Sequence, residues 1–272
     1  MTTAYPILDP RAPTLLTGGA CALAVMTKAP RAGASKTRLV PPLTHAEAAA
    51  LSACFLRDTT TNVAGVARDA RASGVAVYTP PGAQRALADL LPAGFRLLAQ
   101  RGEAFGDRLF HAAEDLLALG YESLCLIDAD SPTLPAQLLA DAARELARPG
   151  DRVVLGPSDD GGYCLIGLKR AHHRLFTGVA WSTARVLAQT VERAAEIDLE
   201  VVKLPAWYDV DDAATLARLC AELFAGGERD MRGAARGYSA PHTREYLARL
   251  ISAEGRVRVW QETSARAAAA RW

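Results

Sequence analysis

The sequence has almost no excess charge and very little lysine. Its 272 residues carry 31 basic and 30 acidic side chains, and only four of the basic residues are lysines. A net charge of +1 gives neither the broad basic face of a dedicated nucleic-acid-binding protein nor the acidic excess of a disordered scaffold. With 50% hydrophobic residues, the chain has the composition of a folded enzyme or small-molecule-binding protein, and we expect no nucleic-acid partner.

Metal-binding cysteine motifs and long apolar runs are also missing. The five cysteines are widely spaced and form no Cys-x-x-Cys pair, which argues against a zinc site or a disulfide framework. No apolar run reaches the roughly 20 residues of a membrane helix. The apolar stretch 14–26 follows Asp9, Arg11 and two prolines and not a basic leader, so we do not interpret it as a signal peptide. We therefore expect a cytoplasmic protein without a membrane span.

Short apolar runs alternate with longer amphipathic stretches along the chain. This is the pattern of repeated βαβ units, and it predicts an α/β fold with a mostly parallel sheet between two helical layers. Strands are predicted at 21–27, 75–79, 95–99, 123–127, 152–155, 163–167 and 200–204. Helices are predicted at 44–72, 83–91, 105–119, 135–147, 182–197 and 212–224. The first helix begins with a capping box, Thr44 with Glu47 three residues later.

The composition changes after Phe224 to a glycine- and arginine-rich stretch. We divide the chain into an N-terminal extension (1–20), a main domain (21–225) and a linker with a C-terminal helical extension (226–272). The extension includes one short predicted helix at 242–251. Residues 229–272 carry nine arginines against four acids. We expect this tail to pack on the main domain or to mediate a homodimer.

A basic loop follows the first predicted strand directly. Four cations lie within eleven residues, separated mostly by small residues that let the backbone approach a ligand, which suits a phosphate chain. The predicted phosphate ligands are Lys28, Arg31, Lys36, Thr37 and Arg38. The loop is not a Walker A loop, because Pro30 and Ser35 stand where glycines would be required. The alternative is a solvated basic loop without a ligand.

Two aspartates separated by one residue follow the fourth predicted strand. In extended chain, residues i and i+2 point to the same side, so Asp128 and Asp130 are expected to converge at the carboxyl end of the strand. Ligands bind at that end of open parallel sheets. Two adjacent carboxylates near phosphates favour Mg²⁺ or Mn²⁺. The alternative is that one of them only caps the helix that begins near Pro135.

A second Asp-x-Asp pair, Asp209 and Asp211, follows the last predicted strand. One of these two residues could complete the metal site, although Asp211 or Asp212 could also be a helix N-cap. The glycine-rich loop 156–163 contains Asp160, which we interpret as a general base or an acceptor-binding carboxylate. A tight turn would explain the same residues without a function. Trp181 could stack on a ligand or belong to the core.

Together these residues resemble the nucleotide-diphospho-sugar transferase, or GT-A, superfamily. The resemblance is to a bacterial family of uncharacterised GT-A-like proteins labelled glycosyltransferases (arsenosugar-biosynthesis type), themselves similar to 2-phospholactate guanylyltransferases. The matching pieces are Lys28-Ala-Pro-Arg31, Lys36-Thr-Arg-Leu39, Asp128-Ala-Asp130-Ser-Pro132, Gly156-Pro157, Asp160-Gly-Gly-Tyr163, Trp181-Ser-Thr183 and Asp209-Val-Asp211. They extend over about three quarters of the chain.

The resemblance implies a GT-A, Rossmann-like αβα sandwich followed by a small C-terminal helical extension. It also implies that the basic loop embraces a nucleotide and that a divalent cation, Mg²⁺ or Mn²⁺, is held by Asp128, Asp130 and Asp211. The later loops would receive a small-molecule acceptor, through Gly161, Gly162, Tyr163 and Trp181. Asp130 and Asp160 become the candidate catalytic residues.

The implied activity is that of a metal-dependent glycosyltransferase with a nucleotide-sugar donor. An alternative is a guanylyltransferase-like nucleotidyltransferase that couples an NTP to a small phosphorylated acceptor, because both reactions need the same cationic loop and acid pair. A third reading is a noncatalytic nucleotide-binding or assembly module. The first loop lacks the Gly-x-Gly-x-Arg pattern of sugar-nucleotide pyrophosphorylases, so the resemblance does not imply a particular base.

Overall fold

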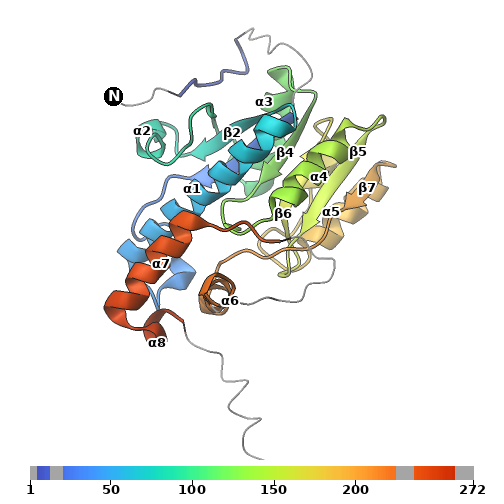
Figure 1. The fold of residues 1–272 in the computed structure, drawn as a ribbon. Coiled ribbons are helices and arrows are strands. Elements are labelled where there is room, and N and C mark those ends of the chain that lie inside the picture. Colours follow the sequence, from blue (N-terminus) through green and yellow to red (C-terminus); the bar gives the residue numbers. More distant parts are fainter. Residues whose placement is uncertain (1–4, 13–20, 225–235, 261–272) are drawn as a thin grey trace, which may run out of the picture.

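A computed structural model describes residues 5–12, 21–224 and 236–260 and contains one seven-stranded sheet (Figure 1). The strand order is β3-β2-β1-β4-β6-β5-β7, and only β6 runs antiparallel to its neighbours. The strands are β1 (Cys21–Lys28), β2 (Ala72–Thr79), β3 (Arg96–Ala99), β4 (Ser123–Ile127), β5 (Arg152–Pro157), β6 (Tyr163–Leu168) and β7 (Glu200–Lys203). The predicted α/β class with a mostly parallel sheet is confirmed.

Helices cover both faces of this sheet. The helices of the described residues are α1 (His45–Asp69), α2 (Gln84–Leu87), α3 (Phe105–Ala118), α4 (Ala136–Ala147), α5 (Val186–Ala195), α6 (Ala213–Phe224), α7 (Pro241–Glu254) and α8 (Arg256–Val259), with 3₁₀ turns η1 (Thr37–Leu39) and η2 (His173–Phe176). The buried side chains of α1 and α4 pack on one face, whereas those of α3 and α5 pack on the other. This is the αβα sandwich expected from the βαβ pattern.

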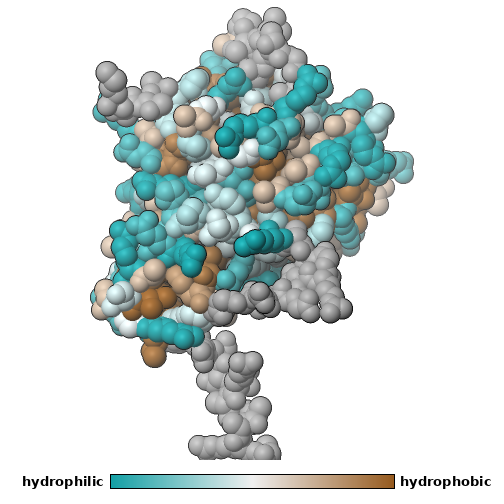
Figure 2. Space-filling model, in the orientation of Figure 1, coloured by the Kyte–Doolittle hydropathy of each residue, from teal (hydrophilic) through white to brown (hydrophobic). Residues whose placement is uncertain are grey.

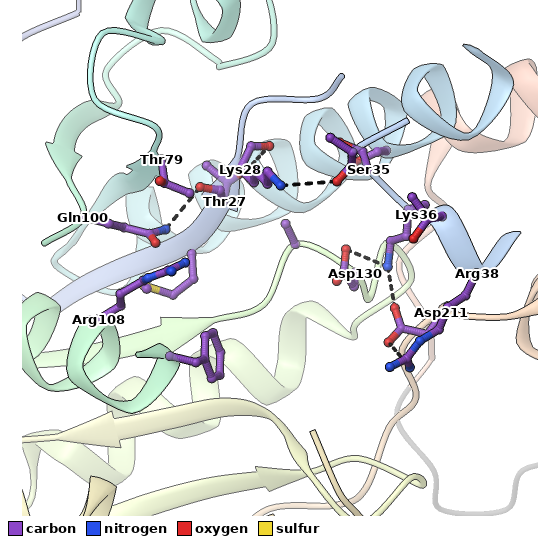
Figure 3. Close-up of a pocket in the computed structure, with 16 residues that line it drawn as sticks. Thr27, Lys28, Ser35, Lys36, Arg38, Thr79, Gln100, Arg108, Asp130 and Asp211 are labelled. Carbon is purple, nitrogen blue, oxygen red and sulfur yellow. Dashed lines mark hydrogen bonds and ion pairs between the residues drawn. The ribbon is translucent and has the colours of Figure 1, made fainter. Parts of the chain in front are cut away.

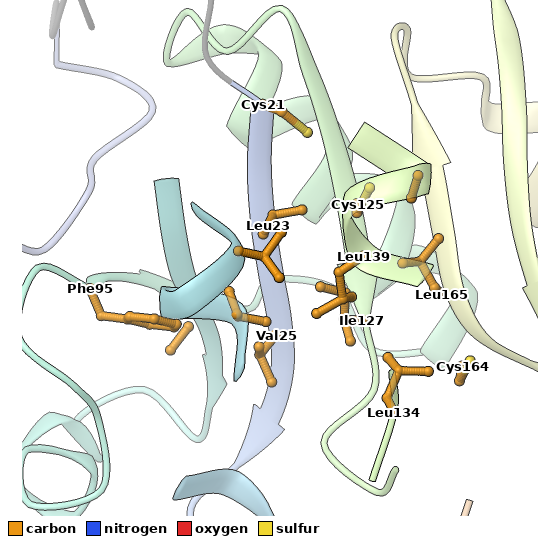
Figure 4. Close-up of a cluster of buried hydrophobic side chains, with 14 of the residues drawn as sticks. Cys21, Leu23, Val25, Phe95, Cys125, Ile127, Leu134, Leu139, Cys164 and Leu165 are labelled. Atoms are coloured by element: carbon orange, nitrogen blue, oxygen red, sulfur yellow. The ribbon is translucent and has the colours of Figure 1, made fainter. Parts of the chain in front are cut away.

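The central strand β1 shows why the sheet is buried on both faces. Successive side chains of a strand point to opposite sides. Leu23 and Val25 therefore enter the core beneath α1 and α4, seen in Figure 4 beside Ile127, while Ala22 and Ala24 enter the opposite core. All four are fully buried, as expected for the middle of a parallel sheet.

The predicted strands agree with the structure, and the main differences are in helix starts. The helix expected at 182–197 begins only at Val186, because Ser182 adopts a left-handed conformation with φ of 61°, which a helix cannot include. The stretch expected as a helix over 83–91 is a single turn, Gln84–Leu87. The capping box of Thr44 and Glu47 is present at the start of α1.

The C-terminal extension contributes α7 and α8, and α7 lies along α1 in Figure 1. The expected packing of the tail on the main domain is seen in these helices, and the homodimer stays a prediction. Most of the N-terminal extension (1–4 and 13–20), the linker residues 225–235 and the end 261–272 lie outside the described residues.

The surface in Figure 2 is largely hydrophilic, with hydrophobic residues in small separate areas on the face shown. In the parts of the chain that the structure describes, no helix combines the length and apolar character needed to cross a membrane. The five cysteines are free, and all except Cys54 are buried.

Candidate nucleotide-binding site

A cavity of about 340 Å³ lies at the carboxyl ends of the strands, where β1 and β4 meet (Figure 3). From β1 the chain first adds β2 and β3 on one side and then crosses to β4 on the other. Ligands of open α/β sheets bind outside the carboxyl ends of strands at such a reversal of strand order. The topology therefore points to this cavity independently of its chemistry.

The basic loop forms one wall of the cavity. Lys28, Thr37 and Arg38 line it with exposed side chains, whereas Arg31 is exposed outside the lining. The loop is braced from within, because buried Ser35 accepts a hydrogen bond from the backbone N–H of Arg31 at 3.0 Å. Lys28, Arg31 and Arg38 thus stay open to solvent on a defined backbone.

Lys36 differs from the other cations of the loop because its side chain is only 6% exposed. Its Nζ lies 2.8 Å from Asp130 Oδ1 and 2.7 Å from Asp211 Oδ1, and it donates to the carbonyl of Val210 at 2.8 Å. Burial alone would lower the pKa of the Lys36 ammonium, but the two carboxylates outweigh it and the pKa is raised. Lys36 is therefore a charged bridge between the two predicted acid loops.

Asp128 does not line the cavity with Asp130. β4 ends at Ile127, so the extended geometry that would place both side chains on one side stops before them. Asp128 accepts hydrogen bonds from the backbone N–H groups of Asp130 and Ser131, and from the Ser131 hydroxyl, each at 3.1 Å. Removal from water, with Asp130 and Asp209 nearby, raises the pKa of Asp128 well above its usual value.

Asp209 and Asp211 differ in the same way, because only the second residue of the pair lines the cavity. Asp209 accepts a hydrogen bond from the Ser158 hydroxyl at 3.0 Å, and partial burial raises its pKa, with a further contribution from Asp211. Asp211 reaches Lys36 and lines the cavity, as does Asp130. The side chains of Asp130 and Asp211 are 43% and 42% exposed, which leaves carboxylate oxygens open to the cavity.

Two exposed carboxylates fit a cation that arrives with a nucleotide. No group of three or more histidine, cysteine, aspartate or glutamate side chains is arranged to hold a metal ion within residues 5–12, 21–224 and 236–260. Mg²⁺, however, is usually bound by one or two carboxylates together with substrate phosphates and water. The donor set of Asp130 and Asp211 meets that requirement, and Asp128 lies beside it with its oxygens already engaged.

The predicted acceptor loop does not line the cavity, and it contacts the second Asp-x-Asp loop through the hydrogen bond from Ser158 to Asp209. Asp160 is exposed and accepts a hydrogen bond from the N–H of Gly162 at 2.8 Å. Gly161 has φ of +90°, and a Cβ there would lie 2.3 Å from the carbonyl oxygen of Ala184, so this turn requires glycine. Asp160, Gly161 and Gly162 are all outside the lining of the cavity.

Trp181 and Tyr163 belong to an aromatic cluster behind that loop. The Trp181 ring lies 6.5 Å from that of Tyr163 and 5.2 Å from that of Phe105, centroid to centroid. Phe105 is 50% exposed and lines the cavity, whereas Tyr163 and Trp181 pack against the core between the sheet and α3. The cluster therefore connects the acceptor loop to the cavity through Phe105.

The far wall of the cavity contains residues that sequence reasoning missed. Thr79 ends β2, Gln100 follows β3, and Phe105 and Arg108 begin α3. Gln100 donates hydrogen bonds to the carbonyls of Thr27 at 3.2 Å and Val77 at 2.8 Å, which ties together the ends of β1 and β2. Thr79 and Gln100 could have been found by applying the strand-end rule to every predicted strand of the sheet, whereas Phe105 and Arg108 lie on a helix.

Comparison with known proteins agrees with this fold. A family model described as an uncharacterized protein conserved in bacteria (DUF2064) matches residues 62–183. A structure from Desulfovibrio desulfuricans G20, provisionally described as a nucleotide-diphospho-sugar transferase, is 28% identical with a TM-score of 0.72, over 86% of this chain and 96% of that one. A search of curated proteins gave no match.

More distant structures include nucleotidyltransferases. A cytidylyltransferase from Leptospira borgpetersenii is 10% identical with a TM-score of 0.49, over 90% of this chain and 98% of that one. A 4-diphosphocytidyl-2C-methyl-D-erythritol synthase from Anaerococcus prevotii is 11% identical with a TM-score of 0.47, over 73% and 95% of the two chains. This chain, whose cavity lies at the strand ends, is thus similar in fold to the provisionally described nucleotide-diphospho-sugar transferase.

Proposed function

We propose that this protein is a metal-dependent transferase that uses a nucleotide-sugar donor. The observation that carries the proposal is the cavity at the β1–β4 junction, where Lys36 joins Asp130 and Asp211 beside a loop of exposed cations. The similarity to a provisionally described nucleotide-diphospho-sugar transferase supports the same substrate class.

The charges in the cavity suit a diphosphate. Lys28 and Arg38 come from the basic loop, and Arg108 comes from α3 on the far wall. Arg38 Nη1 lies 3.8 Å from Asp211 Oδ2, so this cation and the acid loop face the same space. Cations on two sides of a cavity can neutralise the oxygens of one diphosphate without having to move far.

Asp130 and Asp211 are the residues that would hold Mg²⁺ or Mn²⁺. Such a cation, when bound, supplies positive charge that stabilises the departing phosphate. Asp130 and Asp211 contribute the oxygens, while Lys36 keeps them side by side. Because like charges so close repel, the ammonium of Lys36 is what keeps the pair together in the free protein.

The acceptor is assigned to the side of loop 156–163. Asp160 has an exposed carboxylate that could accept the proton of an acceptor hydroxyl, with its position set by the N–H of Gly162. Trp181 supports this side through its edge contact with Phe105 at the cavity rim.

Nucleotidyl transfer is a second candidate, favoured by the density of cations. Lys28, Lys36 and Arg38 of the basic loop line the cavity together with Arg108, and this number of cations would also suit a triphosphate. In that reaction the α-phosphorus is attacked and pyrophosphate leaves, whereas in glycosyl transfer the sugar carbon is attacked and a nucleoside diphosphate leaves.

A two-stage experiment tests the proposal. A thermal-shift screen of nucleoside diphosphates, triphosphates and nucleotide sugars, with and without Mn²⁺, should identify a nucleotide that raises the melting temperature, because a ligand of the folded state stabilises it by mass action. Phosphorus NMR with that nucleotide and a panel of acceptors then identifies the product. Release of a nucleoside diphosphate supports glycosyl transfer, and release of pyrophosphate supports the second candidate.

The control variant is Asp141→Asn, whose carboxylate lies on α4 and pairs with Arg144 away from the cavity. This variant should retain turnover, whereas Asp130→Asn should lose it. Nucleotide binding without turnover in the wild type would instead support a noncatalytic module, and no binding to any nucleotide with metal would contradict the proposal.

A further inference from the structure

The C-terminal helices share a core with the segments that carry the site. This C-terminal core contains buried residues of η1, α1, the second Asp-x-Asp loop, α6, α7 and α8, among them Leu39, Phe55, Val210, Leu216, Leu247 and Val259. Leu39 lies three residues after Lys36, and Val210 lies immediately before Asp211. Two walls of the candidate site are therefore anchored in a core that the C-terminal helices complete.

Lys36 itself rests on this core. Its Nζ lies 5.7 Å from the centroid of the Phe55 ring, and Phe55 is fully buried on α1. A cation at this distance over an aromatic face is attracted to the ring. The position of Lys36 thus depends on the α1 surface on which the core is built.

A chain of polar contacts runs from α8 to the end of the basic loop. Arg258 of α8 binds both carboxylate oxygens of Glu47, with Nη1 3.0 Å from Oε1 and Nη2 2.5 Å from Oε2. Oε2 of Glu47 also accepts the backbone N–H of Thr44 at 2.7 Å. Thr44 directly follows the segment that begins with Lys36, in which the N–H of Leu43 donates to the carbonyl of Leu39 at 2.8 Å. Arg258 is therefore linked to the loop through one carboxylate.

A second contact fixes α7 on α1. The fully buried carboxylate of Asp58 accepts the backbone N–H of His242 at 3.1 Å and that of Thr243 at 2.7 Å, at the first turn of α7. These N–H groups have no partner within their own helix, so Asp58 supplies one from outside. The C-terminal helices are thus attached at both ends, at Asp58 and at Glu47.

We propose that Arg258 is a positioning residue for the nucleotide site: by holding Glu47 at the cap of α1, it keeps the 36–44 segment in the conformation in which Lys36 bridges Asp130 and Asp211. The expected consequence, weaker nucleotide binding, rests on the proposed function. The link between Arg258 and the loop does not. It gives the C-terminal extension a part in the site without placing any of its residues in the cavity.

The chain offers a matched control for this proposal. Arg258 and Arg249 both lie in the C-terminal helices and both pair with a glutamate four residues earlier, at 3.6 and 3.7 Å. Arg258 also binds Glu47, whereas Arg249 is paired with Glu245 on an exposed face. Arg258→Met removes the link, Arg258→Lys replaces the two-pronged contact with a single ammonium, and Arg249→Met removes only a local helix pair.

The experiment measures backbone hydrogen exchange and nucleotide affinity on the full chain. In Arg258→Met, the amides of Leu39, Val40 and Leu43 should exchange faster than in the wild type without ligand, while peptides of β4 stay unchanged. Affinity for UDP, GDP, CDP and ADP with Mg²⁺, measured well below both melting temperatures, should fall about fivefold for whichever of them binds. Arg258→Lys should recover part of both properties, and Arg249→Met should match the wild type.

The outcomes separate the inference from the proposed function. Unchanged exchange at Leu39 to Leu43 in Arg258→Met overturns the inference, even if the variant melts at a lower temperature. Unchanged affinity in a wild type that does bind a nucleotide also overturns it. If the wild type binds none of the nucleoside diphosphates, triphosphates or nucleotide sugars of the wider screen, the proposed function fails, and the exchange measurement still decides whether Arg258 holds the loop.

Discussion

In the two Asp-x-Asp loops of this protein the two aspartates have the same roles, but the first aspartate of each loop is hydrogen-bonded to a serine in a different part of the fold. In each loop the first aspartate is held by a serine and the second reaches Lys36 in the cavity. Asp128 is bonded within its own turn, to Ser131, whereas Asp209 is bonded to Ser158 beyond a different strand. In both loops the inner aspartate therefore holds the loop conformation, while the outer aspartate faces the cavity.

The loops are also joined to each other. The backbone N–H of Val210 donates to the carbonyl of Asp130 at 2.9 Å, and the N–H of Asp159 donates to the carbonyl of Trp207 at 3.0 Å. Lys36 completes the connection through its bonds to both outer carboxylates. A change in one loop should therefore reach the other through the backbone as well as through charge.

The largest difference between inner and outer residues is expected in turnover. Asp130→Asn should lower kcat by about 100-fold, because it removes charge at the point where the departing phosphate must be stabilised. Asp128→Asn should stay within about tenfold of the wild type, because the amide oxygen can still accept the N–H bonds of its turn. Steady-state kinetics with the nucleotide found in the binding screen would measure both. Equal losses of kcat in the two variants would contradict the distinction between inner and outer aspartates.

Stability should show the opposite order. Asp128→Ala leaves the N–H groups of Asp130 and Ser131 without their acceptor, and we expect a loss of about 1–3 kcal/mol in the free energy of unfolding. Asp130→Ala should cost about 1 kcal/mol or less, because the carboxylate of Asp130 is partly exposed to water and Lys36 keeps its second partner, Asp211. Urea unfolding of both variants checks the order, and a greater loss in Asp130→Ala would contradict it.

The smallest expected effect is a dependence on pH that contrasts Glu47 with the inner aspartates. The contact with Arg258 lowers the pKa of Glu47 to about 2 from its ordinary 4.5, whereas burial raises the pKa values of Asp128 and Asp209. A carboxyl with a depressed pKa stabilises the fold fully above 4.5, and this contribution is lost as the pH falls from 4.5 towards 2.

Glu47→Gln should therefore lower the urea midpoint at about pH 6 and have less effect at about pH 3. The same pair of measurements on Glu245→Gln, whose carboxylate is exposed on α7, provides the control. An equal loss in Glu47→Gln at both pH values would show that the ion pair with Arg258 does not stabilise the fold.

Much of the fold could be predicted because strand and helix periodicities are local properties of the chain. The seven strands follow from short apolar runs that alternate with amphipathic stretches, and the capping box at Thr44 follows from two residues three positions apart. The start of α5 could not be predicted, since Ser182 adopts a left-handed conformation and the N–H of Leu187, in the first turn of α5, donates to the carbonyl of Gly161 in the acceptor loop at 2.9 Å. Local preference gives way there to tertiary packing.

The candidate site could be predicted only as a set of strand ends. The sequence pattern indicated which residues follow strands, and three of these, Lys28, Asp130 and Asp211, lie around one cavity in the structure. The pattern could not indicate that the side chain of Asp128 turns back to Ser131, because that depends on where β4 ends. Phe105 and Arg108 were missed because their relation to the cavity depends on the order of strands in the sheet, which is not a local property.

The sequence by itself determined the α/β class, the succession of strands and helices, and the concentration of cations in one loop and acids in two others. Each of these depends on side chains close together along the chain. Only the tertiary structure decided which carboxylates share Lys36, and that α7 and α8 pack behind the loop that carries it. Those contacts join residues more than 90 positions apart, from Lys36 to Asp130 and from Glu47 to Arg258, and only the folded sheet brings such residues together.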